Sequence, residues 1–166
     1  MKNIIWHKLN KFIYESNAIE GVFDQDSFDQ AKFAWEYLIE QEEMNPGVIL
    51  HAHKILMLHQ KLYPNEKGYF RTCEVTIGGD YGLPWSQIPY AIGTWCEIVN
   101  GLTDTKKIKQ CHIEFEKIHP FIDGNGRIGR LLLNWQRHKL GLPILVIYNK
   151  NKQAYYKWFK EVSCEK

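Results

Sequence analysis

The chain contains 166 residues, 45% of them hydrophobic and 14% aromatic, and its formal net charge at pH 7 is +2. This length fits one domain with a sizeable core, and the apolar content excludes an intrinsically disordered chain. The nearly balanced charge, with no run of basic residues, argues against nucleic acid as a partner.

Cysteine usage and the N-terminal sequence bear on the cellular compartment. The four cysteines are scattered, without a Cys-x-x-Cys pair: Cys73, Cys96, Cys111 and Cys164. Scattered thiols are typical of a reduced cytosolic protein. The N-terminal stretch lacks a signal-peptide core, and the longest apolar run, from Ile144 to Tyr148, is far too short to cross a bilayer. We therefore expect a cytoplasmic protein with no membrane partner.

The first predicted helix covers about residues 3 to 20, because apolar residues recur there at helical spacing: Ile5, Leu9, Phe12 and Ile13. The same stripe continues to Ser16 and Glu20, and Gly21 ends the helix. A carboxylate that faces the protein is costly to bury unless a cation pairs with it, and Arg127 and Arg130 are two of only four arginines. The alternative is a frayed helix end with a solvated Glu20, and the pattern leaves both open.

Two helices are expected next. The first begins near residues 26–27 and turns five apolar side chains inward: Phe28, Ala31, Trp35, Leu38 and Ile39. The second begins at Pro46, because proline is suited to the first helical position. Within it, His51 and His53 face different sides, so ordinary solvated or core histidines are favoured over a metal site.

The segment from Gly68 to Pro84 has a different character. Six of its residues alternate as in a short strand: Thr72, Cys73, Glu74, Val75, Thr76 and Ile77. A glycine-rich turn follows them. So short a hairpin is not stable alone and must lie on the helical body, where its unpaired edge could accept an extended peptide as an added strand. The alternative is an ordinary surface hairpin.

The second half of the chain is predicted to be helical again. Ser86 is expected to cap one helix, and Asp104 opens the next. That second helix should end at His119, because Pro120 disfavours the α region in the residue before it. Beyond a further helix, residues 144–148 form a buried short element of unsettled type. A last helix then carries apolar side chains: Ala154, Tyr155, Trp158, Phe159 and Val162.

The densest collection of polar groups is HPFIDGNGRIGR, from His119 to Arg130. It joins the end of one helix to the start of another through a glycine-rich loop. Unpaired backbone N–H groups and the positive end of the dipole make a helix N-terminus an anion site, and Gly124 and Gly126 let a phosphate approach closely. A helix start with a solvated charged face would account for the arginines, but not for the histidine and carboxylate together. We therefore expect phosphate-ester chemistry here.

The same loop also matches the G-x-G-x-x-G dinucleotide pattern from Gly124 to Gly129. That pattern requires a preceding strand and an acidic residue about 20 residues later. Here a helix precedes it, and residues 140–150 contain neither Asp nor Glu. A P-loop is excluded as well, because no Gly-Lys-Ser/Thr ending is present.

HPFIDGNGRIGR resembles the Fic signature, His-Pro-Phe-x-Asp/Glu-Gly-Asn-Gly-Arg-x-x-Arg, at every fixed position. The sequence SNAIEG, from Ser16 to Gly21, resembles the Fic inhibitory motif, Ser/Thr-x-x-x-Glu-Gly/Asn, in members whose inhibitory helix is N-terminal. The resemblance implies an all-α fold: a Fic-type helical bundle with a short β-hairpin flap beside the active site. It also implies a single Fic domain over residues 1–166, with the inhibitory helix at about 3–20 and the flap at about 70–84.

The family members that this sequence resembles are mostly adenylyltransferases. They move AMP from ATP to a Ser, Thr or Tyr hydroxyl of a target protein, which can be the chain itself. By resemblance, His119 is the general base and Asp123 holds Mg²⁺. The nucleotide would be bound by five residues: Gly124, Asn125, Gly126, Arg127 and Arg130. Transfer of another phosphate-linked group, and removal of AMP from a modified target, are open alternatives.

The resemblance also assigns roles outside the signature. Ser16 and Glu20 would be inhibitory, with Glu20 pairing with Arg130 in place of the γ-phosphate of ATP. Residues 72–77 would dock the target as a flap. Tyr155 and Tyr156 resemble a tyrosine pair near the adenine, although core packing is expected for at least one of them.

Overall fold

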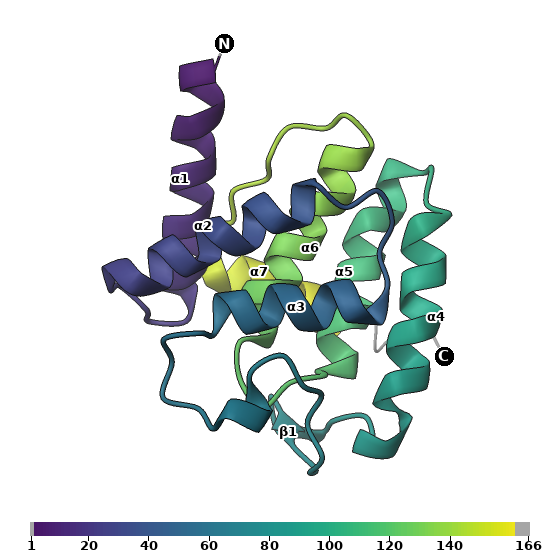
Figure 1. Cartoon of the computed structure of the whole chain (residues 1–166). Coiled ribbons are helices and arrows are strands. Elements are labelled where there is room, and N and C mark those ends of the chain that lie inside the picture. The colour runs from purple at the N-terminus through teal and green to yellow at the C-terminus, as the bar shows by residue number, and fades with distance from the viewer. Residues whose placement is uncertain (1, 162–166) are drawn as a thin grey trace.

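The computed structural model describes residues 2–161, apart from the side chains of residues 2–6, Asp80 and Glu161, so the expected apolar residues Ile5 and Val162 lie outside the described part. Its α-helices are α1 (Lys2–Ile19), α2 (Gln25–Ile39), α3 (Pro46–Leu56), α4 (Ile88–Asn100), α5 (Ile108–Ile118), α6 (Asn125–Lys139) and α7 (Lys152–Glu161). Short 3₁₀ helices are η1 (Pro64–Glu66), η2 (Trp85–Gln87), η3 (Thr105–Lys107) and η4 (Asn149–Asn151). The strands are β1 (Thr76–Ile77) and β2 (Asp80–Tyr81), and β1 lies at the edge of the helical bundle (Figure 1).

Helix α6 is the centre of the bundle, with α1, α2, α3 and α5 packed around it (Figure 1). Its apolar residues Ile128 and Leu132 are fully buried. Arg127 and Arg130 lie on the opposite face of the helix, yet they are only 3% and 1% exposed. The alternative of a solvated charged face is therefore excluded, because helices pack against α6 on both of these faces.

The predicted helix ends agree with the structure in part. Asn45 caps α3 before Pro46, and α5 ends immediately before His119, both as expected. Helix α2 begins earlier than expected, because the Asp24 carboxylate accepts the Ser27 N–H at 2.8 Å. Ser86 caps no α-helix, since it lies inside η2 and α4 starts only at residue 88.

The expected burial pattern needs three corrections. Ile39 and Ala154 were expected to face inward, but both are exposed, at the last residue of α2 and in the first turn of α7. Residues 144–148 form neither helix nor strand and are mostly half-buried. Asn134 of α6 holds this segment by accepting the Leu145 N–H at 2.7 Å and donating to the Leu145 carbonyl at 3.1 Å.

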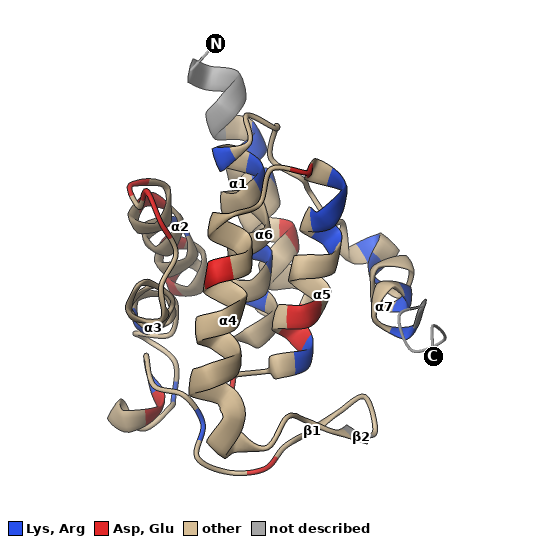
Figure 2. Cartoon of the chain, turned by 90° about the vertical axis from the view of Figure 1, so that its right-hand side faces the viewer, with Lys and Arg blue, Asp and Glu red and all other residues tan. Residues whose placement is uncertain are grey.

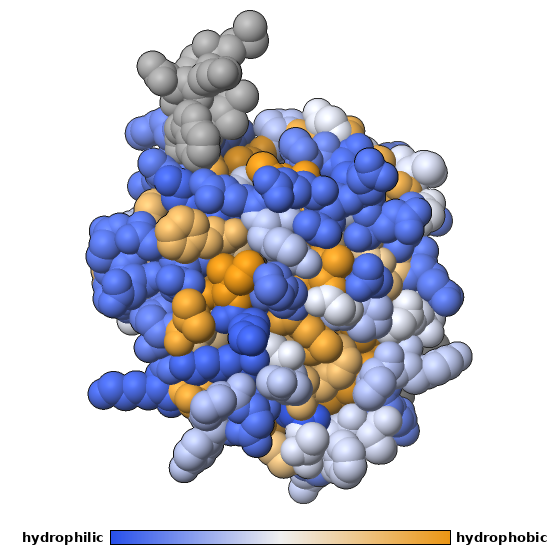
Figure 3. Space-filling view, in the orientation of Figure 1, coloured by the Kyte–Doolittle hydropathy of each residue, from blue (hydrophilic) through white to orange (hydrophobic). Residues whose placement is uncertain are grey.

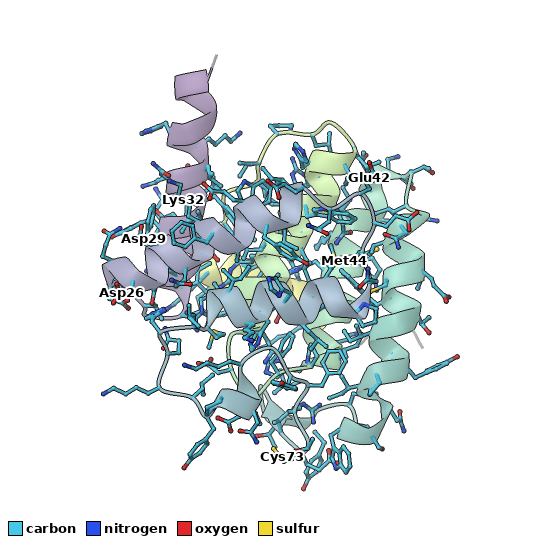
Figure 4. The ribbon with its side chains drawn as sticks, viewed as in Figure 1. Asp26, Asp29, Lys32, Glu42, Met44 and Cys73 are labelled. Atoms are coloured by element: carbon cyan, nitrogen blue, oxygen red, sulfur yellow. The ribbon has the colours of Figure 1, made fainter. Side chains whose placement is uncertain are left out.

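The expected strand over residues 72–77 is mostly irregular. Of these residues Thr76 and Ile77 form a paired strand, antiparallel with Tyr81 and Asp80 around Gly78-Gly79. The ladder is too short for the flap to be held by its own strand pairing. Cys73, at the start of this segment, lies at the exposed edge of the molecule (Figure 4).

The apolar core runs through the bundle, and its buried residues come from six helices: Leu9, Phe12, Ile13, Trp35, Leu38, Ile49, Leu56, Ile92, Trp95, Phe115, Leu132 and Trp135. Hydrophilic residues cover most of the face seen in Figure 3, with smaller hydrophobic patches between them. Among the described helices, none combines the length and apolar character needed to cross a membrane.

Candidate functional site

The loop between α5 and α6 begins and ends with a residue in the left-handed region. His119 has φ 49° and is the one non-glycine residue with positive φ within residues 2–161. Gly124 has φ 81°, and a Cβ there would lie 2.7 Å from the Met57 Sδ, so the position requires glycine. A left-handed histidine costs on the order of 1 kcal/mol, so the surrounding structure must hold this conformation.

Polar groups from three parts of the chain fix the loop backbone. The Arg71 Nε donates to the His119 carbonyl at 2.8 Å, and the Arg71 backbone N–H donates to the Pro120 carbonyl at 2.9 Å. The Asn125 amide accepts the Phe121 N–H at 2.9 Å and donates to the Phe121 carbonyl at 2.8 Å. Because its side chain is occupied in this way, Asn125 can offer a ligand chiefly its backbone N–H.

His53 is the third support of the loop, a role that the local pattern, which left it either solvated or in the core, did not predict. Its Nδ1 accepts the Gly68 N–H at 3.0 Å, so the Nε2–H donates to the Asp123 carbonyl at 2.9 Å. The buried ring also stacks on Phe121, with ring centroids 3.6 Å apart. Burial lowers the pKa of His53 to about 4, so the imidazole is neutral and purely structural near pH 7.

The His119 side chain is a half-buried base at the mouth of the loop. Its Nδ1 lies 3.3 Å from the Glu116 carbonyl. Since a carbonyl only accepts, Nδ1 carries the proton and Nε2 keeps its lone pair. Burial is the main cause that lowers the pKa of His119 below its ordinary value. The ring is therefore neutral near pH 7, with a free basic nitrogen.

His119 lines a pocket of about 150 Å³ together with residues of the loop and of the end of α1: Glu20, Ile122, Asp123, Gly124, Asn125, Gly126 and Arg127. The pocket lies at the N-terminus of α6, where Gly124 provides no side-chain cap. The first N–H groups of α6 are thus left to bind an anion. A Cβ at Gly126 would collide with the Glu20 Oε1, so Glu20 lies directly against this helix start.

Arg130 joins the end of α1 to the signature loop. Its Nη2 donates to the Glu20 Oε1 at 2.7 Å and to the Ser16 carbonyl at 2.9 Å, and its Nε donates to the Ser16 Oγ at 2.9 Å. Arg130 is buried, whereas the Glu20 side chain is 38% exposed. The expected contact between Glu20 and Arg130 is therefore present, and a Glu20 pointing unpaired into solvent is excluded.

Arg127 is buried with part of its hydrogen-bonding capacity unused. Its Nη2 lies 3.7 Å from the Asp123 Oδ2 and 3.3 Å from the Met57 Sδ. Its Nε and Nη1 have no hydrogen-bond partner among the described residues. Leaving a buried guanidinium partly unsatisfied is unfavourable, so an anion in the adjoining pocket would be attracted to it.

Asp123 is the carboxylate available for a metal ion. Its side chain is 56% exposed, and one oxygen accepts the Gly124 N–H at 2.6 Å. The part of the chain that the structure describes contains no cluster of three metal-ligating side chains. A lone carboxylate beside an anion site suits Mg²⁺, which is commonly held by one or two carboxylates, substrate phosphates and water.

Glu116, one turn before His119, is a second carboxylate near Arg130 that the sequence analysis did not single out. Its Oε1 is buried without a hydrogen-bond partner among the described residues, and a Cβ at Gly129 would collide with it. Burial raises the pKa of Glu116 to about 7, although the Arg130 charge opposes the shift. Near pH 7 Glu116 is thus partly neutral and leaves much of the Arg130 charge to other anions.

The tyrosine pair of α7 divides between core and surface. Tyr155 is buried, and its hydroxyl donates to the Nε2 of His112 at 2.9 Å because the His112 Nδ1–H donates to the Gly129 carbonyl. Tyr156 is exposed. The expectation that at least one of the two packs in the core is confirmed.

The model of the Fic/DOC family matches residues 49–136, and the chain belongs to this family. Protein adenylyltransferase Fic from Drosophila grimshawi is 31% identical over 158 residues, covering 90% of this chain and 31% of that protein. Its counterpart from Drosophila erecta is also 31% identical over 158 residues, covering 90% of this chain and 30% of that protein. The chain thus spans about a third of the length of these curated relatives.

Solved structures share the fold. A Fic domain containing signaling protein from Bacteroides thetaiotaomicron superposes with a TM-score of 0.80 at 20% identity, covering 94% of this chain and 72% of that one. Fic-1 from C. elegans gives a TM-score of 0.80 at 18% identity, covering 99% of this chain and 58% of that one. The all-α Fic fold expected from the signature is therefore confirmed.

Proposed function

We propose that this chain transfers AMP from ATP to a hydroxyl side chain of a protein, and that Glu20 restrains the reaction through Arg130. One observation carries the proposal: a neutral imidazole with a free Nε2 and an uncapped helix N-terminus line the same pocket. The first group can activate a hydroxyl, and the second can bind a triphosphate. The relatives named protein adenylyltransferase agree with this assignment.

In the proposed reaction, the His119 Nε2 removes the proton from the target hydroxyl as its oxygen attacks the α-phosphorus of ATP. The bond from the α-phosphorus to the bridging oxygen breaks, and pyrophosphate leaves with the electron pair. The α6 N–H groups bind the phosphate oxygens, while Arg127 and Arg130 offset the charge of the leaving group. Asp123 would hold Mg²⁺, which supplies further charge neutralisation when it is bound.

Glu20 would inhibit by competing with ATP for the same cation. Its carboxylate lies 2.7 Å from the Arg130 Nη2, at the position that we assign to the γ-phosphate. While this ion pair persists, the triphosphate can bind only with its end displaced and its α-phosphorus poorly aligned for attack. Ser16 would support the inhibited state, because its hydroxyl accepts from the Nε of the same guanidinium and its carbonyl accepts from the Nη2 that binds Glu20.

We assign target docking to the flap of residues 70–84, and two features of its surroundings support this. Between Glu74 and Glu97 the sequence contains one charged residue, Asp80. Helix α4 and the β1–β2 turn accordingly carry few charges in Figure 2. Tyr81 and Tyr90 are 90% and 82% exposed in this region. An uncharged surface with exposed tyrosines suits a protein partner.

The experiment is an intact-mass measurement on purified protein after incubation with ATP and Mg²⁺. The Glu20→Gly variant is expected to gain one AMP, on itself or on an added target, about tenfold faster or more than the parent, a change of ~1.4 kcal/mol in barrier. UTP and other nucleotide donors, tested in parallel, identify other transferred groups by their adduct masses.

The double variant Glu20→Gly/His119→Ala is the matched control, because it keeps the anion site and loses the base. It should bind ATP and give no adduct. Equal labelling of the parent and the Glu20→Gly variant would refute inhibition by Glu20. Labelling that persists in the double variant would remove His119 as the base.

A further inference from the structure

Arg71 is a buried arginine, 2% exposed, that the sequence analysis did not single out. Its guanidinium donates to backbone carbonyls of two separate segments. One segment is the end of α5, with His119 at 2.8 Å and Ile118 at 3.4 Å. The other is the flap, with Cys73 at 2.7 Å and Leu83 at 2.6 Å.

The first segment contains the base of the proposed reaction. The Ile118 and His119 carbonyls belong to the peptide planes on either side of the His119 Cα, so one guanidinium fixes both planes. The Arg71 backbone N–H also donates a hydrogen bond to the Pro120 carbonyl. One residue therefore holds the carbonyls of three consecutive residues, 118 to 120. Those two planes determine the direction of the His119 Cα–Cβ bond and hold its left-handed conformation. A cation is also favoured at the C-terminus of α5.

The second segment carries β1 and β2. Cys73 and Leu83 lie on opposite sides of the short strand pair, and the same guanidinium joins them. Because the ladder is only two residues long, this junction is a main support of the flap. One side chain therefore ties both ends of the strand pair to the backbone of His119.

We propose that Arg71 is a positioning residue that orients the His119 imidazole relative to the flap, so that a hydroxyl presented at the flap meets Nε2. This inference rests on the proposed role of His119. The positioning role requires arginine at this position, because the rigid planar guanidinium reaches four separate carbonyls. The three donors of lysine, by contrast, radiate from a single nitrogen.

The test compares Arg71→Lys with Arg137→Lys in the Glu20→Gly protein. Arg137 is the matched control, since it donates to the Pro143 carbonyl near the opposite end of α6. A misplaced base slows chemistry without weakening nucleotide binding, so Arg71→Lys should lower kcat by about tenfold or more at an unchanged KM for ATP. Arg137→Lys should leave both constants within about twofold. An unchanged kcat for folded Arg71→Lys, or an equal change in kcat and KM, would overturn the proposal.

A second measurement tests the role of Arg71 without relying on AMP transfer. The Arg71 charge adds to burial in lowering the pKa of His119, whereas Glu20 and Asp123 raise it. In an NMR titration, Arg71→Gln should therefore raise the pKa of His119, while Arg71→Lys should shift the His119 signals through the altered backbone. If both variants leave these signals and the titration as in the parent, Arg71 does not position His119. If the Glu20→Gly protein forms no adduct, the proposed AMP transfer is refuted. The NMR comparison then still decides whether Arg71 positions His119.

Discussion

The chemistry open to His119 depends on which ring nitrogen carries the proton. The Glu116 carbonyl holds the proton on Nδ1, and His119 makes this bond while its backbone is in the left-handed conformation at the end of α5. Nε2 is therefore the basic atom, because the hydrogen bond to a backbone carbonyl keeps the proton on Nδ1. Any change that releases the left-handed turn would alter both the direction and the tautomer of the ring.

The proposed role of His119 as the base also predicts how AMP labelling depends on pH. A general base acts in its neutral form, which dominates above its pKa, and burial holds the pKa of His119 below the ordinary value of 6.5. In the Glu20→Gly protein a carboxylate that raises this pKa is absent, so the pKa should be lower still. Initial rates of AMP labelling should thus stay constant from pH 8 to about 7 and fall to half only below pH 6.5.

Circular dichroism at each pH is the control for unfolding in that experiment. A half-point above pH 6.5 would contradict the environment described for His119, whose burial favours the neutral ring. A rate that does not depend on pH between 5 and 8 would show that proton removal by this group does not limit transfer.

At the scale of elements, the α5–α6 loop takes its rigidity from outside itself. Arg71 lies near the start of the flap and His53 belongs to α3, and each binds a different carbonyl of the loop. Phe121 is buried against the His53 ring, so packing and hydrogen bonding act at the same place. The loop is consequently a junction of three elements, and its geometry depends on all of them.

His53→Ala should therefore destabilise the fold. It removes two hydrogen bonds and leaves a cavity beside Phe121, a loss of about 2–4 kcal/mol in the free energy of unfolding. Since burial lowers the pKa of His53 from 6.5 to about 4, its stabilising contribution is complete above pH 6.5 and is lost as the pH falls towards 4. Urea denaturation at pH 7.5 and pH 4.5 should show a smaller difference between parent and variant at the lower pH.

His51→Ala is the matched control, because His51 is exposed and lies two residues away on the same helix. Its effect should stay within about 0.5 kcal/mol at both pH values. If the two variants lose equal stability, then His53 does not support the loop.

The sequence predicted those features of the loop and its neighbours that depend on residues close together in the chain, and not those that depend on distant partners. The end of α5 at His119 and the start of α3 at Pro46 follow from local rules for proline, and both were found. The buried roles of Arg71 and His53 arise from partners 48 and 70 residues away, so no local pattern contains them. The burial of Arg127 cannot be read from the local pattern either, since helical periodicity assumes that a helix has one solvent face.

At the scale of the whole molecule, the proposed inhibitory element is also part of the core. Helix α1 contributes three almost fully buried side chains to the apolar cluster: Leu9, Phe12 and Ile13. Its last turn carries Ser16, and Glu20 follows directly after its end. Another carboxylate of α1, Glu15, accepts the Asn149 N–H before α7. The same helix thus contributes to stability and carries the proposed inhibitory residues, which lie only at its C-terminal end.

This arrangement predicts that relief of inhibition is local. Burying three such side chains contributes about 5–9 kcal/mol, which is comparable to the stability of a whole domain at about 5–15 kcal/mol. A chain that lacks residues 1–21 should therefore lose its cooperative thermal transition, whereas Glu20→Gly should melt within a few degrees of the parent while it labels faster. Calorimetry and AMP labelling of both proteins provide the test. A truncated chain that folds and labels like the Glu20→Gly variant would show that α1 can leave as a unit, and that release of the whole helix is an available route to activation.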